Sequence, residues 1–322
     1  MKKNLILFSY FILYISCIAN KSYAQKARPD TVHTGIYINS IYDIDFKQKE
    51  YTVDFWLWLK YKNKAFDFLQ NLEIPQAKTV TKSFSTVDSS DGRIYLLMKL
   101  QCVMKDSWKI GNFPFDRQKL RLTLENSQYT SDSLVFAVDT VGKQYDPRFT
   151  LNGWEVDSFT VSTGKKAYET TFGDPALSKP HSEYSTFKVK AEITREAMGL
   201  FWKLFLGMYV AFLIAYVCFY IHADGIDSRF GLSVGSLFAV IGNKYIVDSS
   251  LPESTSFTLV DTLHGITLFV IIAVITCTAY SLKLVKQNKA EKAHQFDMLA
   301  AQVILVIYVI LNIWFISKAN MG

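Results

Sequence analysis

The amino-acid sequence predicts an all-β sandwich followed by an all-α domain of four membrane-spanning helices, and two observations carry this prediction. The first part of the chain alternates apolar and polar residues over many short stretches, whereas the second part contains long apolar runs. Of the 322 residues, 50% are hydrophobic and 15% are aromatic, which is a rich apolar content for a protein without a membrane domain.

The sandwich is expected over residues 25–196. Apolar residues alternate with polar ones in the stretches YTVDFWLWLKY, RIYLLMKLQCVM and KLRLTLENS, which is the period of a half-buried strand. Turn signals such as Asp91-Gly92 and Asn152-Gly153 separate stretches of this kind. Many short strands without a long helix between them are typical of an antiparallel sandwich, here of about 170 residues.

The membrane domain is expected over residues 197–317. Four segments approach or exceed the roughly 20 residues that a spanning helix needs; they cover 200–221, 227–248, 257–283 and 296–316. The second segment contains Asp227, Arg229 and Lys244, so a soluble loop and helix is the alternative for it. Four lysines between the last two segments indicate a cytoplasmic loop there. With an exported N-terminus, the polar segment must then cross the membrane too.

The first 24 residues are predicted to be a signal peptide. Lys2 and Lys3 precede an apolar run, and Ser22-Tyr23-Ala24 offers small residues at a cleavage site. An uncleaved anchor and a lipoprotein signal that ends at Cys17 are the alternatives. Cleavage would export the N-terminal domain, so we expect a multi-pass protein of the cell inner membrane with a periplasmic or extracellular sandwich.

Several classes of protein find no support in the sequence. The net charge of +6 is not clustered in the way that nucleic-acid binding needs. Cys102 is the single cysteine of the exported region, and no CxxC or Cys/His spacing suggests a metal site. No GxSxG, HExxH or P-loop motif is present, so we expect neither an enzyme nor a cofactor.

The polar second segment carries one helical stripe, because a set of residues recurs at steps of four and three. Its members are Asp227, Gly231, Gly235, Phe238, Gly242, Tyr245 and Ser249. In one interpretation the glycines serve close helix packing. In the other the stripe lines a pore, where Phe238 forms an apolar gate and Asp227 lies at the cytoplasmic mouth. One helix cannot enclose a pore, so the second interpretation requires an oligomer.

The chain combines a leader, a sandwich with the motif FPFD at residues 113–116, and four spans, of which the second is polar. This combination resembles the pentameric ligand-gated ion channels, or Cys-loop receptors. Bacterial members look most similar, and the resemblance covers most of the chain after the leader. Asp106 and Leu120 stand where the family has its two loop cysteines, and Gly207 stands where it usually has proline. The resemblance implies a homopentamer in a lipid bilayer, with a small molecule or protons as the agonist.

The resemblance also implies a coupling role for the FPFD loop, which rests on the membrane domain in that family. Its residues are Phe113, Pro114, Phe115 and Asp116. The two phenylalanine rings are expected to touch the linker at Leu251 and Pro252. Asp116 and Arg195 are candidates for a buried ionic cluster that transmits movement. The alternative for Asp116 is a local hydrogen bond within a turn.

The ligand site of the family lies between subunits, behind a hairpin that corresponds to residues 165–183. The candidate ligand-binding residues are Trp56, Tyr129, Tyr168, Phe172 and Tyr184. Trp58 lies on the same side of its strand as Trp56, and we expect it to belong to the sandwich core. Ser127 stands where the family places a further aromatic residue. A cage for a quaternary amine needs several ring faces around the cation, so a standard amine agonist is not expected.

The charge of the stripe predicts which ions permeate. A ring of Asp227 side chains at a narrow mouth selects cations. Arg229 lies two residues further on, about 200° around the helix, so it should point away from the pore. A rotated helix would invert the prediction, and Asp248 and Glu253 at the outer mouth add negative charge. The predicted function is therefore a cation-selective channel, and the alternative is a membrane-anchored periplasmic binding or signalling receptor without a conducting pore.

Overall fold

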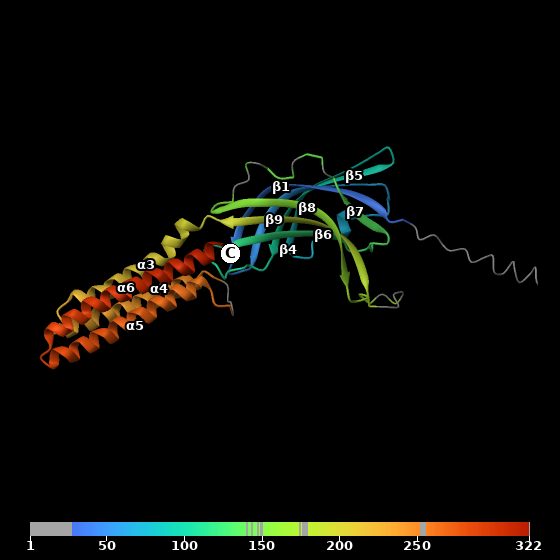
Figure 1. Cartoon of the computed structure of the whole chain (residues 1–322). Coiled ribbons are helices and arrows are strands. Elements are labelled where there is room, and N and C mark those ends of the chain that lie inside the picture. Colours follow the sequence, from blue (N-terminus) through green and yellow to red (C-terminus); the bar gives the residue numbers. More distant parts are fainter. Residues whose placement is uncertain are drawn as a thin grey trace, which may run out of the picture.

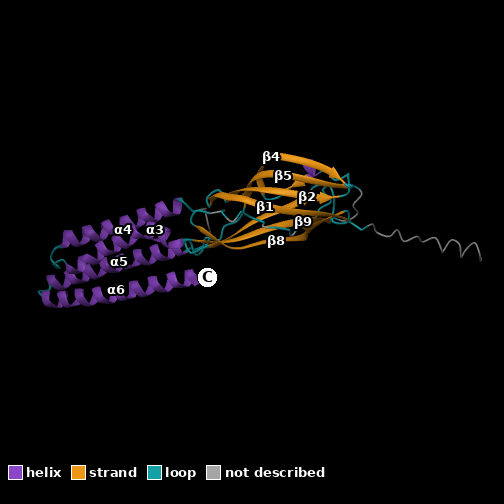
Figure 2. Cartoon of the chain, turned by 90° about the horizontal axis from the view of Figure 1, so that it is seen from above, coloured by secondary structure: helices purple, strands orange, loops and turns teal. Residues whose placement is uncertain are grey.

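The structure is a computed structural model that describes residues 28–139, 141–142, 144–146, 148, 151–173, 175, 180–251 and 256–321. The predicted signal peptide lies outside these residues, as does Pro252. The described chain is elongated, with its strands at one end and its long helices at the other (Figure 1 and Figure 2). The last helix ends back at the junction between the two parts (Figure 1).

The strands of the first domain confirm the predicted β architecture. In the described residues they are β1 Asp30–Asp45, β2 Glu50–Tyr61, β3 Leu72–Glu73, β4 Ala77–Ser90, β5 Arg93–Lys105, β6 Arg117–Asn126, β7 Leu134–Val138, β8 Trp154–Tyr168 and β9 Ser182–Arg195. A short helix, α2 (Phe68–Asn71), precedes β3.

Two sheets face each other, with the strand orders β4-β5-β2-β1-β7 and β3-β6-β9-β8. Among the described strands, β1 and β7 run parallel, with Asp30 opposite Leu134. The other neighbouring strands with recorded register are antiparallel, as predicted. The parallel pair joins segments far apart in the sequence, which is why local alternation could not reveal it.

Alternation along β2 decides which side chains enter the core between the sheets. Phe55, Leu57 and Leu59 are fully buried, and they belong to one core with Leu124 of β6 and Phe187 of β9. Neighbouring residues of a strand point to opposite faces, so Trp56 and Trp58 lie on the other face of β2.

The expectation that Trp58 belongs to the core is therefore wrong. Its side chain is half-buried, and its indole N–H donates to the Asp139 carboxylate at 2.9 Å. The ring lies over Gly35, where an added Cβ atom would come within 2.2 Å of it. Glycine at this position is what allows the indole to lie flat against β1.

The second domain consists of long helices, as predicted. Those of the described chain are α3 Ala197–Val217, α4 Ile226–Ser249, α5 Leu259–Lys286 and α6 Ala290–Met321, with a 3-10 turn η1 (Cys218–Tyr220) after α3. All four are long and apolar enough to cross a membrane by length and composition. The polar segment is helix α4, whose mean hydropathy of 1.4 is the lowest of the four.

The helices pack into one bundle. Phe205 and Met208 of α3, Val240 of α4 and Leu263 of α5 share one buried apolar cluster. Large apolar side chains such as Trp314 of α6 remain exposed on the outside of the bundle. An apolar outer surface is what a bundle surrounded by lipid requires.

Candidate functional site

Helix α4 turns its predicted stripe away from its own bundle. The exposed residues include all seven members: Asp227, Gly231, Gly235, Phe238, Gly242, Tyr245 and Ser249. Phe238 is 67% exposed and Tyr245 is 77% exposed, although both are large and aromatic. A Cβ atom added at any of the three glycines would meet nothing within 4 Å. The glycines therefore do not serve helix packing within a single chain.

The opposite face of α4 is buried against the other helices. Ser233, Ser236, Val240 and Val247 lie there, each almost fully buried. The two serine hydroxyls donate to backbone carbonyls one turn earlier, at 2.9 Å and 2.8 Å, so their polar atoms are satisfied within the helix. This face of α4 thus packs against the bundle without leaving either serine hydroxyl unpaired.

Arg229 belongs to the buried face and points into the bundle. It is 1% exposed, and its guanidinium donates to the Asp297 carboxylate of α6 at 2.8 Å and to the Ile221 carbonyl at 2.9 Å. The Ser281 hydroxyl of α5 also donates to Asp297, at 2.9 Å. Asp297 was missed in the sequence, where its signal is a lone carboxylate at the start of an apolar run. An ion pair this deeply buried destabilises a protein strongly when one partner is removed.

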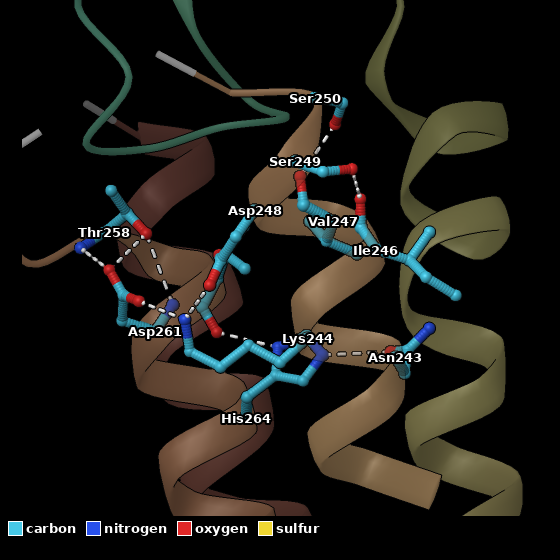
Figure 3. A network of polar contacts seen from close by, with 11 residues as sticks. Asn243, Lys244, Ile246, Val247, Asp248, Ser249, Ser250, Thr258, Asp261 and His264 are labelled. Atoms are coloured by element: carbon cyan, nitrogen blue, oxygen red, sulfur yellow. Dashed lines mark hydrogen bonds and ion pairs between the residues drawn. The ribbon is translucent and has the colours of Figure 1, made fainter. Parts of the chain in front are cut away.

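A second polar network joins α4 to α5 near their ends at the sandwich (Figure 3). The Lys244 ammonium reaches Asp248 of its own helix at 2.5 Å and Asp261 of α5 at 2.8 Å. Asp261 also accepts from the Thr258 backbone N–H at 2.9 Å, which completes the capping box that starts α5. Asp248 thus shares one ammonium group with Asp261 and keeps 47% of its side chain exposed, and its contribution of negative charge at the outer mouth stays a prediction. Glu253 lies outside the described residues.

The same network includes a histidine. His264 of α5 places Nε2 2.9 Å from the Asn243 side-chain oxygen and Nδ1 2.9 Å from the Val260 carbonyl. The Asn243 amide has room because α3 has Gly207 there, where a Cβ atom would lie 3.2 Å from the amide nitrogen. Helices α3, α4 and α5 therefore meet around one asparagine side chain.

The loop of residues 111–116 connects the sandwich to the bundle. The backbone carbonyl of Gly111 accepts from the N–H of Leu259, the first residue of α5, at 2.8 Å. The Phe115 ring lies 5.6 Å from the Phe201 ring of α3. Phe113 is buried and lines a cavity of about 560 Å³ together with Leu251. Phe113 and Leu251 thus line the same cavity and Phe115 packs on α3, while the contact of both rings with the linker stays a prediction.

Asp116 forms the expected ionic cluster with Arg195. The carboxylate is almost fully buried and accepts from Arg195 at 2.7 Å and 3.2 Å and from the Gln118 amide at 2.6 Å. The guanidinium carbon of Arg195 lies 4.0 Å, 4.6 Å and 5.0 Å from the ring centroids of Trp154, Phe46 and Phe113. Both carboxylate oxygens are used by side chains, and one of these, Gln118, is only two residues away, so the ion pair and a local hydrogen bond are present together.

The hairpin of β8 and β9 brings three of the predicted aromatic residues together. The ring centroids of Tyr168, Phe172 and Tyr184 are separated by 5.4 Å, 5.8 Å and 6.3 Å. Tyr129 lies elsewhere, with its ring 4.8 Å from Phe66. Trp56 belongs to the other sheet, where its ring lies 5.7 Å from that of Phe84. In a single chain the candidate ligand residues thus form one cluster and two separate positions.

Two charged residues that the sequence reasoning missed complete the hairpin cluster. The Tyr168 hydroxyl donates to the Glu125 carboxylate at 2.8 Å, and the Lys166 ammonium lies 4.5 Å from the Tyr168 ring centroid. Burial raises the pKa of Glu125, although the Tyr168 hydroxyl opposes that rise. The signal for Lys166 was its place two residues before Tyr168, which puts both side chains on one face of β8.

The described residues show no arrangement for a metal. No group of three or more His, Cys, Asp or Glu side chains gathers in a way that could hold a metal ion in this part of the chain. Cys102 is buried, and burial raises the pKa of its thiol to about 12. A thiol in that state is an apolar filler rather than a reactive group.

Comparison with known proteins gives the chain several relatives. No protein-family model matches it. A proton-gated ion channel of Gloeobacter violaceus is 26% identical over 288 residues, which cover 82% of this chain and 77% of that protein. A gamma-aminobutyric acid receptor subunit beta of Caenorhabditis elegans is 19% identical over 238 residues, which cover 66% of this chain and 40% of the subunit. A neuronal acetylcholine receptor subunit non-alpha-2 of Carassius auratus is 23% identical over 252 residues, which cover 70% of this chain and 51% of the subunit. The chain therefore spans about half the length of these animal relatives.

Proposed function

We propose that this chain, a homologue of the pentameric ligand-gated ion channels, forms a homopentameric cation channel in which α4 of each subunit lines the pore. The relatives are ion channels and receptor subunits rather than enzymes. One observation carries the finer proposal: α4 exposes its polar stripe on the outside of its own subunit and buries Arg229 on the other side. A spanning helix with an exposed polar face must meet protein or water rather than lipid.

Five copies of α4 around one axis would enclose a water-filled path. Gly231, Gly235 and Gly242 keep that path wide, because they place no side chain in it. Phe238 lies among them with most of its ring exposed. A ring of such side chains blocks ions by excluding water, so Phe238 is the proposed gate.

The proposed selectivity depends on two charges at the same end of α4. Asp227 lies in the first turn of the helix and is exposed. Arg229 is turned into the bundle and paired with Asp297 at 2.8 Å. Only the carboxylate can then contribute to a ring around the pore, and an anionic ring at a narrow mouth favours cations.

The sandwich is proposed to bind the agonist and to transmit its effect. The hairpin cluster of Tyr168, Phe172 and Tyr184 would form one side of a site whose other side is Trp56 of the next subunit. Asp116, Arg195 and the loop 111–116 would carry the movement to α3 and α5. The agonist would be a small molecule or a proton, and the sandwich would face the periplasm or the exterior from the cell inner membrane once residues 1–24 are removed.

A reversal potential in a salt gradient tests this proposal without knowledge of the agonist. The purified protein is placed in planar bilayers, and Phe238→Ala supplies an open pore. We expect a cation-selective current from Phe238→Ala, and a loss of most of that selectivity when Asp227→Ala is added. Asp224→Ala is the matched control, because it removes one carboxylate from the adjacent loop, where the side chain is 77% exposed, without changing the stripe.

Other outcomes would overturn parts of the proposal. Anion selectivity, or equal selectivity with and without Asp227, would mean that another ring of residues controls permeation. A silent Phe238→Ala pentamer that reaches the bilayer would place the gate elsewhere. Intact oligomers that never conduct would favour a binding or signalling receptor without a pore.

A further inference from the structure

The hairpin cluster already contains a cation that the protein itself supplies. An organic cation binds aromatic side chains by lying over a ring face within about 6 Å of the ring centroid. The Lys166 ammonium occupies such a position over Tyr168, at 4.5 Å from the centroid. A ligand ammonium would have to displace Lys166 from this face before it could use the ring.

The register of the hairpin fixes Lys166 in this place. Lys166 of β8 lies opposite Tyr184 of β9, and Tyr168 follows on the same face of β8. The Tyr168 hydroxyl oxygen accepts a hydrogen bond from the Lys166 ammonium, which raises the pKa of Lys166, so the side chain keeps its charge at neutral pH. Lys165, its neighbour in the sequence, points to the other face and pairs with Glu183 at 2.6 Å.

The carboxylate nearest to the cluster is not available to a ligand. Glu125 is 2% exposed, and one of its oxygens accepts from the Tyr168 hydroxyl. Glu73 of β3 is exposed and lies opposite Glu125 of β6, and its carboxylate lies near enough to act on the pKa of Lys166. Lys188 of β9 shares the face of Lys166 and is exposed, with its ammonium next to Gly164. On the face of the hairpin that carries Tyr168 and Tyr184, a ligand therefore meets the ammonium groups of Lys166 and Lys188.

We propose that Lys166 is the specificity-determining residue of the hairpin site, which excludes organic cations and binds small ligands that carry a carboxylate. The carboxylate pairs with the Lys166 ammonium, and the apolar part of the ligand rests on the Phe172 ring, which is 62% exposed. This inference rests on the proposed function, in which the hairpin forms one side of the agonist site.

Saturation-transfer NMR on the purified full-length pentamer tests the inference directly. Acetate and tetramethylammonium are the two probes, because each gives one sharp methyl signal and binds weakly enough for the method. The variants are Lys166→Met, which removes the cation, and Lys166→Arg, which keeps it. Lys165→Met is the matched control, since it removes an adjacent ammonium on the opposite face. A double variant, Lys166→Met with Tyr168→Ala, locates the bound probe.

We expect the wild type, Lys166→Arg and Lys165→Met to bind acetate and to give little signal from tetramethylammonium. Lys166→Met should no longer bind acetate. Its affinity for tetramethylammonium should rise by about fivefold to thirtyfold, which is the range that a cation–π contact supports. The gain should disappear in the double variant. Equal tetramethylammonium binding by the wild type and by folded Lys166→Met would overturn the inference. Acetate binding that is unchanged in Lys166→Met would also overturn it.

The test is independent of the pore. Binding is measured without current, and the reversal-potential experiment is made without agonist. If the protein conducts cations but fails the binding test, only this inference is wrong. If it binds acetate through Lys166 but never conducts, the proposed channel function is wrong.

Discussion

Arg195 performs two tasks that a lysine could not perform together. Its planar guanidinium donates to both oxygens of Asp116 while its flat face lies over Trp154, Phe46 and Phe113. A lysine ammonium is a point charge on a flexible stem and cannot stack in this way. The last residue of β9 is thereby held against the loop that contacts α3 and α5.

Glu125 gives a pH dependence whose sign follows from its burial. Burial raises the pKa of Glu125 in the folded protein, so its protonated form is favoured there and the stability it contributes is lost as the pH rises through the folded pKa. Glu125→Gln should therefore raise the melting temperature by a few degrees at neutral pH, of the order that about 1 kcal/mol produces. The difference from the wild type should shrink as the pH falls below the ordinary range of a glutamate. Thermal unfolding at several pH values measures this.

Glu183 provides the contrast for that experiment. Lys165 and the Ser131 hydroxyl lower the pKa of Glu183, so its stabilising effect is present above its ordinary pKa and is lost as the pH falls through the folded value. Glu183→Gln should then lower the melting temperature slightly at neutral pH, and the effect should vanish in acid. Changes in melting temperature of the same sign for Glu125→Gln and Glu183→Gln at neutral pH would contradict this account of the two carboxyl groups.

Helix α4 is held in one rotation by contacts at both of its ends. Arg229 and Asp297 fix one end to α6, and Lys244 and Asp261 fix the other end to α5. Between these anchors the buried face carries Ser233, Ser236 and Val240, while the stripe stays exposed and a Cβ atom added at its glycines would meet nothing within 4 Å. The exposed glycines are thus a consequence of how the charged residues are placed, and not of helix packing inside one subunit.

The anchor at Arg229 can be tested by removing one partner and then both. Asp297→Ala leaves a buried guanidinium without its carboxylate and should destabilise the folded protein by about 3–5 kcal/mol. Arg229→Met combined with Asp297→Leu should recover most of that loss, because well-packed apolar residues often replace a buried ion pair at little cost. In the Phe238→Ala background the double variant should keep its cation selectivity, since Asp227 is unchanged. Thermal unfolding and the reversal potential are the two measurements.

The two measurements separate the structural role of Arg229 from a role in permeation. A double variant that is stable but loses cation selectivity would mean that Arg229 acts on the permeating ions after all. Asp297→Ala with wild-type stability would mean that the ion pair does not anchor α4.

For the whole molecule, local patterns in the sequence were sufficient to predict that the strands and long helices exist, but not which face of each is buried. The steps of four and three along α4 identified a stripe that the structure exposes, whereas Trp58 of β2 was expected in the core that Leu57 and Leu59 occupy. Each of these patterns concerns one strand or helix at a time, because it depends only on the side chains of that element. The parallel pairing of β1 with β7 and the position of Trp58 depended on other segments and could not be read in this way.

The same limit applies to the candidate sites. The motif FPFD and Arg195 led to the ionic cluster, but the aromatic rings of Phe46 and Trp154 that support it come from distant segments. Asp297 became the partner of Arg229 because the start of α6 lies near the start of α4 in the bundle, which no spacing reveals. Lys166 could be placed over Tyr168 only when the register of the hairpin with β9 was known. Partners that are far apart in sequence are what the structure adds.

The junction between sandwich and bundle gives the last prediction. Asp116→Asn leaves the largely buried Arg195 guanidinium without a countercharge, so we expect the folded protein to lose about 3–5 kcal/mol. Glu192→Gln is the matched control, because Glu192 pairs with Lys119 across the same strands, β6 and β9, but on the exposed surface at 3.4 Å. Its loss should be far smaller, because water screens an exposed ion pair. Thermal unfolding of the protein measures both. Equal losses would show that the cluster at Asp116 contributes no more than a surface ion pair, and the junction would then depend on the contacts of Phe113 and Phe115 and on the hydrogen bond between Gly111 and Leu259.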